Sequence, residues 1–253
     1  MSKANLNKKY DSIFFSPHLD DAVLSVGGFI DNEVKKRKKI LIVTFFTAGN
    51  DSLELQKDQI DFLQNSFSKK SEKLFVKRKK EDIKATQFLQ CDFFHFKYCD
   101  AFFRVNKTQF LYPSYNDLFS GKIHTLESVE KNIQKDITTL LKQYSHEKTH
   151  LFAPLGVGAH VDHILISRIF QKRAQKQKNI SFWQDVPYRN HISSSEKQIS
   201  QIQEFPQISF YTCTAENQKR KKKACSFYKS QIHSLEKNGL GDIDYKKETF
   251  FKL

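Results

Sequence analysis

Two short clusters of histidine and aspartate could bind a metal ion. The first, SPHLDD, covers residues 16–21, and the second, GAHVDH, covers residues 158–163. Each follows an apolar run that ends in a turn residue. Zinc accepts histidine nitrogen and aspartate oxygen, and a catalytic zinc site uses three protein ligands and a water molecule. The two clusters could share one ion if both predicted strands end at the same edge of a sheet.

The spacing inside each cluster lets its side chains converge. His18 and Asp21 are three residues apart across a predicted strand-to-helix turn. His160 and His163 are three residues apart at the start of a predicted helix, so they share a helix face. These four side chains are candidate ligands, and the spacing does not decide which of them bind the metal.

Two further aspartates, Asp20 and Asp162, lie next to the candidate ligands. A carboxylate there could orient a ligating histidine or act as a general base in metal-assisted hydrolysis. Either cluster alone is better explained structurally, because aspartate at a helix N-terminus is favoured by capping and by the helix dipole. The occurrence of two clusters, each after a strand and each opening a helix, favours a metal site.

Alternating strands and helices must position these clusters. A strand over 10–16, a helix over 20–34 and a strand over 39–46 form a predicted βαβ unit, with parallel strands. Gly27-Gly28 inside this helix predict close packing against the sheet. Further predicted elements are helices over 75–90, 126–144, 160–174 and 215–236, strands over 92–98, 150–153, 180–184 and 208–212, loops or short helices over 47–70, and an irregular aromatic segment over 100–118.

This alternation predicts one α/β domain over residues 1–253. We expect a Rossmann-like, doubly wound, mostly parallel sheet flanked by helices. Ligands in such sheets bind beyond the carboxyl ends of the strands, where both clusters are predicted to lie.

Composition narrows the class of protein. The chain has 253 residues, of which 39% are hydrophobic, enough for a large core. No apolar run approaches the length of a membrane span, and no signal peptide is visible. The four cysteines show no CxxC spacing, so we expect free thiols and a cytoplasmic setting.

The net charge of +14 is concentrated in lysine runs. These runs contain few aromatic residues and no recognisable nucleic-acid module, so we interpret them as solvated helix faces. Nucleic acid is therefore not an expected partner. An anionic small-molecule substrate remains an alternative.

The two clusters resemble the two signature motifs of the PIG-L/LmbE-like zinc de-N-acetylases. Gly27-Gly28 after the first cluster adds to this resemblance. Weaker matches are Arg78 to Glu81 for an RxxE helix, residues 183–188 for a (Y/W)xDxPY segment, and residues 222–231 for a C-terminal helix. Leu19 stands where proline is commonest and Ala22 where glutamate is common, which puts the substrate in question rather than the chemistry.

The resemblance implies a role for each residue of the clusters. The implied cofactor is Zn²⁺, with another divalent ion such as Fe²⁺ as an alternative. Asp20 is implied as the general base, His160 as the group that stabilises the oxyanion and helps to protonate the amine, and Asp162 as the residue that orients His160. The implied zinc ligands are His18, Asp21 and His163, and the candidate substrate contacts are Arg78, Asp100, Arg104 and Tyr188.

These observations predict a zinc-dependent amidase that removes acetyl from an N-acetylated amino sugar. One alternative keeps the site but changes the substrate to another acylated amine or a thiol conjugate. A second alternative is a basic polyanion-binding protein with a vestigial metal site. The sequence does not identify the group attached to the sugar or the oligomeric state.

Overall fold

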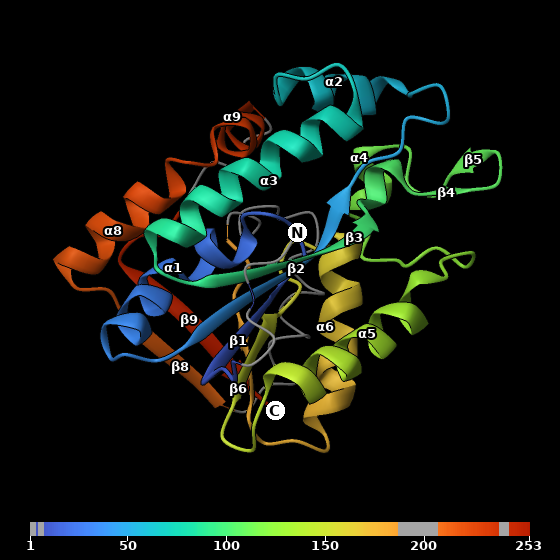
Figure 1. The fold of residues 1–253 in the computed structure, drawn as a ribbon. Coiled ribbons are helices and arrows are strands. Elements are labelled where there is room, and N and C mark those ends of the chain that lie inside the picture. The colour runs from blue at the N-terminus through green and yellow to red at the C-terminus, as the bar shows by residue number, and fades with distance from the viewer. Residues whose placement is uncertain (1–3, 5–7, 187–206, 238–242) are drawn as a thin grey trace.

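A seven-stranded sheet with helices on both faces forms the centre of the molecule (Figure 1). The structure is a computed structural model that describes residues 4, 8–186, 207–237 and 243–253. The strand order is β3-β2-β1-β6-β7-β9-β8. The strands are β1 Ser12–Ser16, β2 Ile40–Ala48, β3 Asp92–Cys99, β6 His150–Pro154, β7 Ile180–Trp183, β8 Gln207–Thr212 and β9 Lys247–Lys252.

The strands from β3 to β7 in this order are parallel. β1 lies in the middle, where Phe14 pairs with Ile42 of β2 on one side and with Phe152 of β6 on the other. Every residue of β1 is buried, as expected for a parallel strand that is covered on both faces. The predicted doubly wound, mostly parallel sheet is therefore confirmed.

Successive side chains of β1 enter two separate cores, because side chains alternate along a strand. Ile13 and Phe15 pack with α5 and α6, whereas Phe14 packs with α1, α3 and α8 on the opposite face. The helices are α1 Asp21–Lys35, α2 Lys57–Asn65, α3 Ser71–Phe88, α4 Tyr115–Leu118, α5 Val129–Tyr144, α6 Val161–Ala174, α8 Ala215–Cys225 and α9 Lys229–Lys237.

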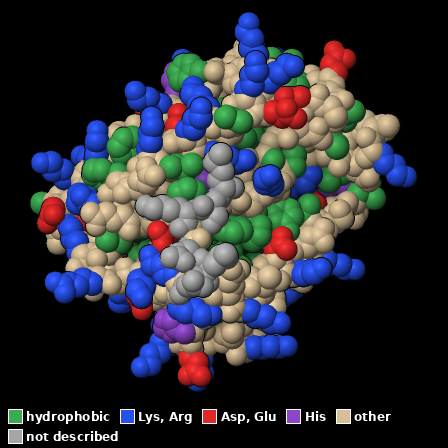
Figure 2. Space-filling model, viewed as in Figure 1, with side chains coloured by type: hydrophobic (Ala, Val, Ile, Leu, Met, Phe, Trp, Pro, Cys, Tyr) green, Lys and Arg blue, Asp and Glu red, His purple; other side chains and the backbone are tan. Residues whose placement is uncertain are grey.

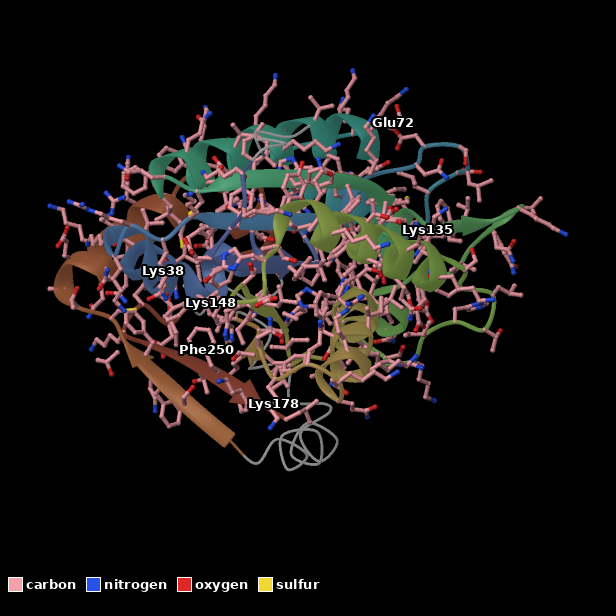
Figure 3. The ribbon with its side chains drawn as sticks, turned by 60° about the horizontal axis from the view of Figure 1, so that its bottom comes forward. Lys38, Glu72, Lys135, Lys148, Lys178 and Phe250 are labelled. Carbon is pink, nitrogen blue, oxygen red and sulfur yellow. The ribbon has the colours of Figure 1, made fainter. Side chains whose placement is uncertain are left out.

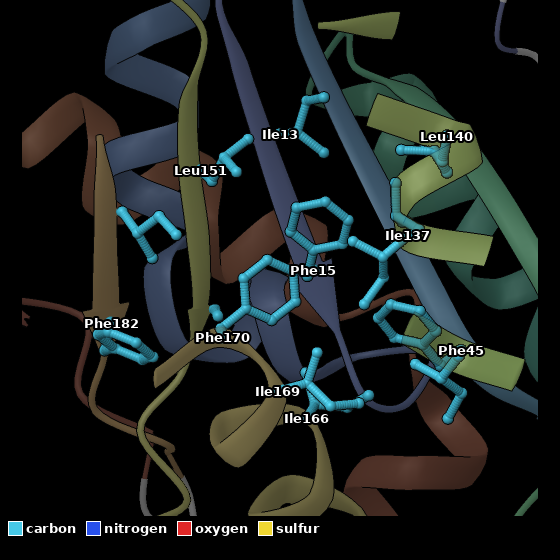
Figure 4. Close-up of a cluster of buried hydrophobic side chains, with 14 of the residues drawn as sticks. Ile13, Phe15, Phe45, Ile137, Leu140, Leu151, Ile166, Ile169, Phe170 and Phe182 are labelled. Carbon is cyan, nitrogen blue, oxygen red and sulfur yellow. The ribbon is translucent and has the colours of Figure 1, made fainter. Parts of the chain in front are cut away.

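The core beneath α6 fixes this helix against the strands that carry the clusters. Figure 4 shows Phe15 of β1 beside Phe170 of α6, and their ring centroids are 4.4 Å apart. Ile166 and Ile169 of α6 are buried in the same cluster. The N-terminal end of α6 is thereby held near the carboxyl ends of β1 and β6.

A third apolar cluster lies on the site side of the sheet. It joins Leu19 and Val161, one from each metal-site cluster, to the aromatic segment around Phe102. This segment, predicted as irregular over 100–118, contains the short helix α4, a 3₁₀ turn at Ala101–Phe103 and a small hairpin of β4 Val105–Asn106 and β5 Gln109–Phe110. The segment forms one wall of the site.

The single helix predicted over 215–236 is wrong, because the chain turns between α8 and α9. α8 ends at Cys225, and the N–H of Tyr228 donates to the carbonyl of Cys225, three residues back. Tyr228 is fully buried, and its hydroxyl donates to Asp82 Oδ1 at 2.7 Å. A buried aromatic anchor therefore interrupts the helix, and α9 begins at Lys229.

β9 is an element that the sequence did not predict. It is inserted between β7 and β8 and runs antiparallel to both. Glu248 of β9 is buried, so the strand places a charged residue where the usual alternation would place an apolar one. Its partners are far away in sequence, and no local pattern reveals the pairing.

Gly27 and Gly28 of α1 permit close packing, as predicted, but the nearest atoms belong to α8, to β9 and to Cys213, which lies between β8 and α8. A Cβ on Gly28 would overlap Cys213 Sγ and lie 3.0 Å from Glu248 Oε1. A Cβ on Gly27 would lie 3.3 Å from Lys221 Cγ. Larger residues would displace these buried side chains.

The amino ends of the parallel strands carry exposed lysines. Figure 3 labels Lys38, Lys148 and Lys178, which precede β2, β6 and β7, respectively. This edge is opposite the one that holds the histidine clusters. Within the described part of the chain, no helix is both long and apolar enough to cross a membrane.

Candidate metal centre

Both histidine clusters lie at the carboxyl edge of the sheet, as predicted. His18 follows β1 by two residues, and the loop after β6 leads to His160 at the N-cap of α6 (Figure 1). Because β1 and β6 are adjacent parallel strands, their carboxyl ends bring the clusters together. The buried polar side chains of the two clusters are His18, Asp20, Asp21, His160, Asp162 and His163.

Three potential ligand atoms form a nearly equilateral group. His18 Nδ1, Asp21 Oδ2 and His163 Nε2 are 3.2 Å from one another in each pairing. Ligands 2.0–2.2 Å from a tetrahedral zinc are separated by about 3.3–3.6 Å. Two imidazole nitrogens and one carboxylate oxygen at this spacing fit a zinc ion with small adjustments.

A carboxylate holds His163 in the orientation that a metal ligand needs. His163 Nδ1 lies 2.6 Å from Asp185 Oδ1, at the end of β7. The other oxygen of Asp185 accepts hydrogen bonds from the backbone N–H groups of Gly156 at 2.7 Å and Val157 at 2.9 Å. With its Nδ1 proton directed to Asp185, His163 presents the lone pair of Nε2 to the site.

Asp162 plays the corresponding part for His18. Its Oδ2 lies 3.2 Å from His18 Nε2 and accepts a hydrogen bond from the N–H of Ala101 at 3.0 Å. The guanidinium of Arg104 donates to the other oxygen and also pairs with Glu127 at 2.8 Å. Asp162 can therefore remain ionised while it is fully buried, and it leaves His18 Nδ1 directed at the ligand group.

The hydrogen bonds of Asp162 favour a different role from the expected one. The family resemblance implied that its side chain orients His160. The carboxylate is instead bonded to His18, Ala101 and Arg104, whereas the backbone N–H of Asp162 donates to His160 Nδ1 at 3.2 Å. The helix start itself therefore orients His160, since His160 is the N-cap of α6.

In the group of potential ligands, the carboxylates and the histidines stabilise each other's charged forms. Burial alone would lower the pKa of His163, but Asp21 and Asp185 raise it to about 9. Burial would raise the pKa of Asp21, yet His163 and His18 hold it well below its usual range. Hydrogen bonds to Asp162 and Asp21 likewise outweigh burial and raise the pKa of His18. The carboxylates thus stabilise positive charge here, and a metal ion could replace the protons.

The pKa shifts of the two remaining side chains, Asp20 and His160, suit acid–base chemistry. Burial and the charge of Asp21 raise the pKa of Asp20 to about 7. Burial and His18 lower the pKa of His160 well below its usual value, so this imidazole is neutral. Because His160 Nδ1 accepts the N–H of Asp162, its proton resides on Nε2, which is then a hydrogen-bond donor.

His160 is also within reach of the metal position. The ring nitrogens of His18, His160 and His163 lie within 4.8 Å of one another. A second group, with the same spacing limit, consists of His18, Asp100 and Asp162. The hydrogen bonds that Asp162 makes to His18 and Ala101 account for this second group without an ion.

Of the four candidate substrate contacts, Arg78 and Asp100 border the site. Asp100 Oδ2 is 3.5 Å from His18 Nε2. Arg78 is only 6% exposed, stacks on Phe62 and donates to Ser66 Oγ at 3.2 Å. Its buried Nε has no hydrogen-bond acceptor among the described residues. Arg78 is therefore a buried charge, although lysines surround it in the sequence.

The other two candidate substrate contacts are Arg104 and Tyr188. Arg104 forms ion pairs with Asp162 and Glu127, so its charge is neutralised inside the protein. Tyr188 lies outside the described residues. Glu127 and Asp185 are functional candidates that residue spacing did not reveal. Only the resemblance of residues 183–188 to a family segment pointed to the region of Asp185.

Comparison with known proteins agrees with this geometry. The sequence profile of the PIG-L family, described as GlcNAc-PI de-N-acetylase, matches residues 13–174. This segment is more than half of the chain and contains both clusters. No curated protein matches the chain by sequence.

Solved structures share the fold over nearly the whole chain. A deacetylase of the teicoplanin biosynthesis pathway has a TM-score of 0.74 and 18% identity, covering 95% of this chain and 96% of that one. The A40926 pseudoaglycone deacetylase has a TM-score of 0.68 and 21% identity, covering 98% and 97%. The N,N'-diacetylchitobiose deacetylase of Pyrococcus horikoshii has a TM-score of 0.55 and 14% identity, covering 94% and 82%.

Proposed function

This chain belongs to the PIG-L family, and we propose that it is a zinc-dependent hydrolase that deacetylates an N-acetylated amino sugar. Family membership makes it a deacetylase that acts on N-acetyl amide bonds. The zinc ion, the amino-sugar substrate and the residue roles below are the proposal. In it, residues 1–253 act as a single catalytic domain, and water converts the amide into a free amine and acetate.

The observation that carries the proposal is the group of three donor atoms with its two orienting carboxylates. His18, Asp21 and His163 would hold the metal, while Asp162 and Asp185 fix the two rings. Bound zinc supplies Lewis acidity toward the amide carbonyl and makes water easier to deprotonate at neutral pH. Fe²⁺ is an alternative ion for the same mixed nitrogen and oxygen ligands.

Asp20 is the general base in this proposal. Its carboxylate receives no hydrogen bond from any described residue, and its pKa is raised to about 7. A base with this pKa can accept a proton from water near neutral pH. It can then return the proton to the departing amine.

His160 stabilises the negative charge that develops on the amide oxygen. Its neutral ring carries the proton on Nε2, and the Asp162 N–H fixes the opposite side of the ring. A preorganised donor of this kind lowers the barrier because it needs no reorganisation during the reaction. His160 also contributes to protonation of the amine.

Arg78, Asp100 and Tyr188 are the proposed contacts to the sugar. We assign to a hydroxyl or phosphate oxygen of the substrate the Nε of Arg78, a buried donor without an acceptor among the described residues. Asp100 is a buried carboxylate beside His18 and can accept hydrogen bonds from sugar hydroxyls. Relatives of the same fold include a deacetylase solved with teicoplanin and one named for diacetylchitobiose, which supports a sugar conjugate as the substrate class.

We place this activity in the cytoplasm. All four cysteines are free, and burial raises the pKa of Cys99, Cys213 and Cys225 to about 12. Unpaired, unreactive thiols are typical of a reducing compartment.

Acetate release from a panel of compounds tests the proposal. The panel contains neutral and anionic glycosides of N-acetylglucosamine, simple N-acyl amines and N-acetylated thiol conjugates. We expect turnover of at least one amino-sugar glycoside by protein loaded with one zinc, and its loss after chelation. Preference for a simple amine or a thiol conjugate would contradict the amino-sugar assignment.

The polyanion-binding alternative predicts a different result. It requires tight, steeply salt-dependent binding of nucleic acid that is the same with and without metal. Absence of stoichiometric zinc binding together with such behaviour would contradict the hydrolase proposal.

A further inference from the structure

Helix α1 contains a break that two buried charged side chains fill. Val26 has φ −133° and ψ 25°, which is not helical, and it divides α1 into a site half, residues 21–25, and a distal half, residues 27–35. Beside the break, Lys221 Nζ of α8 lies 2.8 Å from Glu248 Oε1 of β9. Both side chains are 0% exposed.

The two side chains bond to the backbone groups on either side of the break. Lys221 Nζ donates to the carbonyl of Ser25, at the end of the site half, at 3.2 Å. Glu248 accepts from the N–H groups of Gly28 at 2.8 Å and Phe29 at 2.7 Å, at the start of the distal half. A helix C-terminus favours positive charge and an N-terminus favours negative charge, so each half is capped by the matching charge.

The ammonium group of Lys221 has three hydrogen-bond acceptors. The ammonium of Lys221 also donates to the carbonyl of Asp244 at 2.8 Å, which gives it three acceptors with those of Ser25 and Glu248. Gly28 leaves room for Glu248 to approach the backbone. The glycine pair after the first cluster is thus explained by the two caps.

The break lies beside the segment that orients His163. Ser25 Oγ accepts the N–H of Val186 at 3.1 Å and lies 3.3 Å from the carbonyl of Val186. Val186 follows Asp185, whose carboxylate bonds to His163. The site half of α1 therefore starts at Asp21, directly after Asp20. It ends at Ser25, which bonds to Val186, the residue after the carboxylate that holds His163.

We propose that Lys221 and Glu248 are positioning residues that fix the site half of α1, and with it Asp20 and Asp21, relative to His163. Both residues come from the chain beyond residue 174, the end of the matched family segment. The C-terminal part of the chain thus sets the geometry of the centre. The part of this inference that concerns metal binding rests on the proposed function.

The simpler explanation is that the pair only joins α8 to α1. Arg220, next to Lys221, provides the matched control, since it pairs with Asp31 in the distal half. Arg220→Met therefore removes a contact between the same two helices without touching the break. Arg220 is 27% exposed and Lys221 is fully buried, so a role in general packing predicts that Lys221→Met speeds exchange in both halves of α1 rather than mainly in the site half.

Amide hydrogen exchange on the metal-free protein tests the positioning directly. In Lys221→Met, we expect exchange in the site half to become at least about tenfold faster, because local opening there becomes easier. In Arg220→Met, the site half should exchange as in the wild type. Unchanged exchange of the site half in Lys221→Met, or equal acceleration in both variants, would overturn the inference.

Glu248→Gln provides a second variant if Lys221→Met does not fold. It keeps the shape of the side chain and an oxygen for one N–H, but it removes the negative charge and the second acceptor. We expect the same faster exchange near the break, with the first affected amides in Gly28 and Phe29. Wild-type exchange at these amides would contradict the capping role of Glu248.

Zinc titration and steady-state kinetics connect the positioning to the site. Lys221→Met should lower zinc affinity by roughly 10-fold, the lower end of the loss when groups that support metal ligands are removed. Its kcat should fall with KM unchanged, whereas Arg220→Met should leave both unchanged. Wild-type zinc affinity and kcat in Lys221→Met would overturn the inference, while absence of zinc binding by the wild-type protein would contradict the proposed function instead.

Discussion

Two adjacent aspartates at the start of α1 differ in their tendency to hold a proton. Burial raises the pKa of both, but His163 and His18 outweigh it for Asp21, whose pKa is well below its usual range. For Asp20, burial and the charge of Asp21 outweigh the effects of Arg78, His18 and His163, so its pKa rises to about 7. Environment thus separates the proposed ligand, Asp21, from the proposed base, Asp20, although the two side chains are identical.

Asp20→Asn tests this separation. We expect the variant to bind zinc as the wild type does and to lose turnover by roughly 10²–10⁴-fold, the usual contribution of a general base. Metal analysis and steady-state kinetics measure the two properties. Loss of zinc in Asp20→Asn would show that Asp20 is a ligand and that its role and that of Asp21 are exchanged.

His160 and His163 provide a second pair of identical residues with different proposed roles. His163→Ala should lose zinc and activity together. His160→Ala should keep zinc and lose roughly 10²–10³-fold in kcat, as when one oxyanion donor is removed. Equal loss of zinc from both variants would indicate four protein ligands and a structural metal.

The residues of the centre were predictable where the chemistry lies in short segments. Histidine and aspartate spacing identified both clusters, although the choice of His163 over His160 came from family resemblance. Asp185 and Glu127 were not predicted from spacing, because each acts through a partner far away in sequence. The hydrogen bond between Asp162 and Arg104 was not predicted for the same reason, since the two residues are 58 positions apart.

Asp162→Asn and Asp185→Asn test the carboxylates that orient the histidines. We expect each to lower zinc affinity by roughly 10–100-fold, because each holds the ring of a ligand. Zinc titration by calorimetry measures this loss, with His160→Ala as the variant that retains affinity. Wild-type zinc affinity and a lowered kcat in Asp162→Asn would instead support the role that the family resemblance implied, the orientation of His160.

At the level of secondary structure, the turn between α8 and α9 connects three parts of the molecule. Glu81 of α3 accepts from Ser230 N at 3.1 Å and from Ser230 Oγ at 2.6 Å, which caps α9. Gln231 Nε2 donates to the carbonyl of Leu19 at 3.3 Å, inside the first cluster. The turn thus brings α9 against both α3 and the loop of the first histidine cluster.

Tyr228→Phe tests the anchor of this turn. The hydroxyl donates to Asp82, which His95 also contacts at 2.7 Å, so its removal leaves a buried carboxylate short of one donor. We expect the free energy of unfolding to fall by about 1–3 kcal/mol, with zinc content unchanged. Denaturant unfolding measures the change.

Tyr144→Phe is the matched control for this substitution. The Tyr144 hydroxyl has no hydrogen-bond partner among the described residues, so its loss should change the free energy of unfolding much less than the loss of the Tyr228 hydroxyl. Equal destabilisation by the two substitutions would contradict the proposed role of the Tyr228 hydrogen bond.

For the whole molecule, sequence periodicity predicted the parallel part of the sheet but not its antiparallel edge. Buried strands such as β1 and β2 are continuous apolar runs and are recognisable locally. β9 carries Glu248 toward the interior and pairs with β7 and β8, which are distant in the chain. Such pairing depends on tertiary contacts rather than on local pattern.

The lysine and arginine side chains do not gather in one place on the face that Figure 2 shows. Figure 2 shows Lys and Arg side chains spread over the visible face, without one continuous basic surface. This distribution agrees with the interpretation of the lysine runs as solvated helix faces. It leaves the buried histidine centre as the strongest indication of function.

Crystals grown with equimolar zinc test the central claim most directly. Anomalous diffraction at the zinc edge should show one ion about 2.0–2.2 Å from His18 Nδ1, Asp21 Oδ2 and His163 Nε2. His160 should remain unligated, and Asp20 should face the open side of the ion. Zinc bound elsewhere, or held by both His160 and His163, would contradict the proposed catalytic centre.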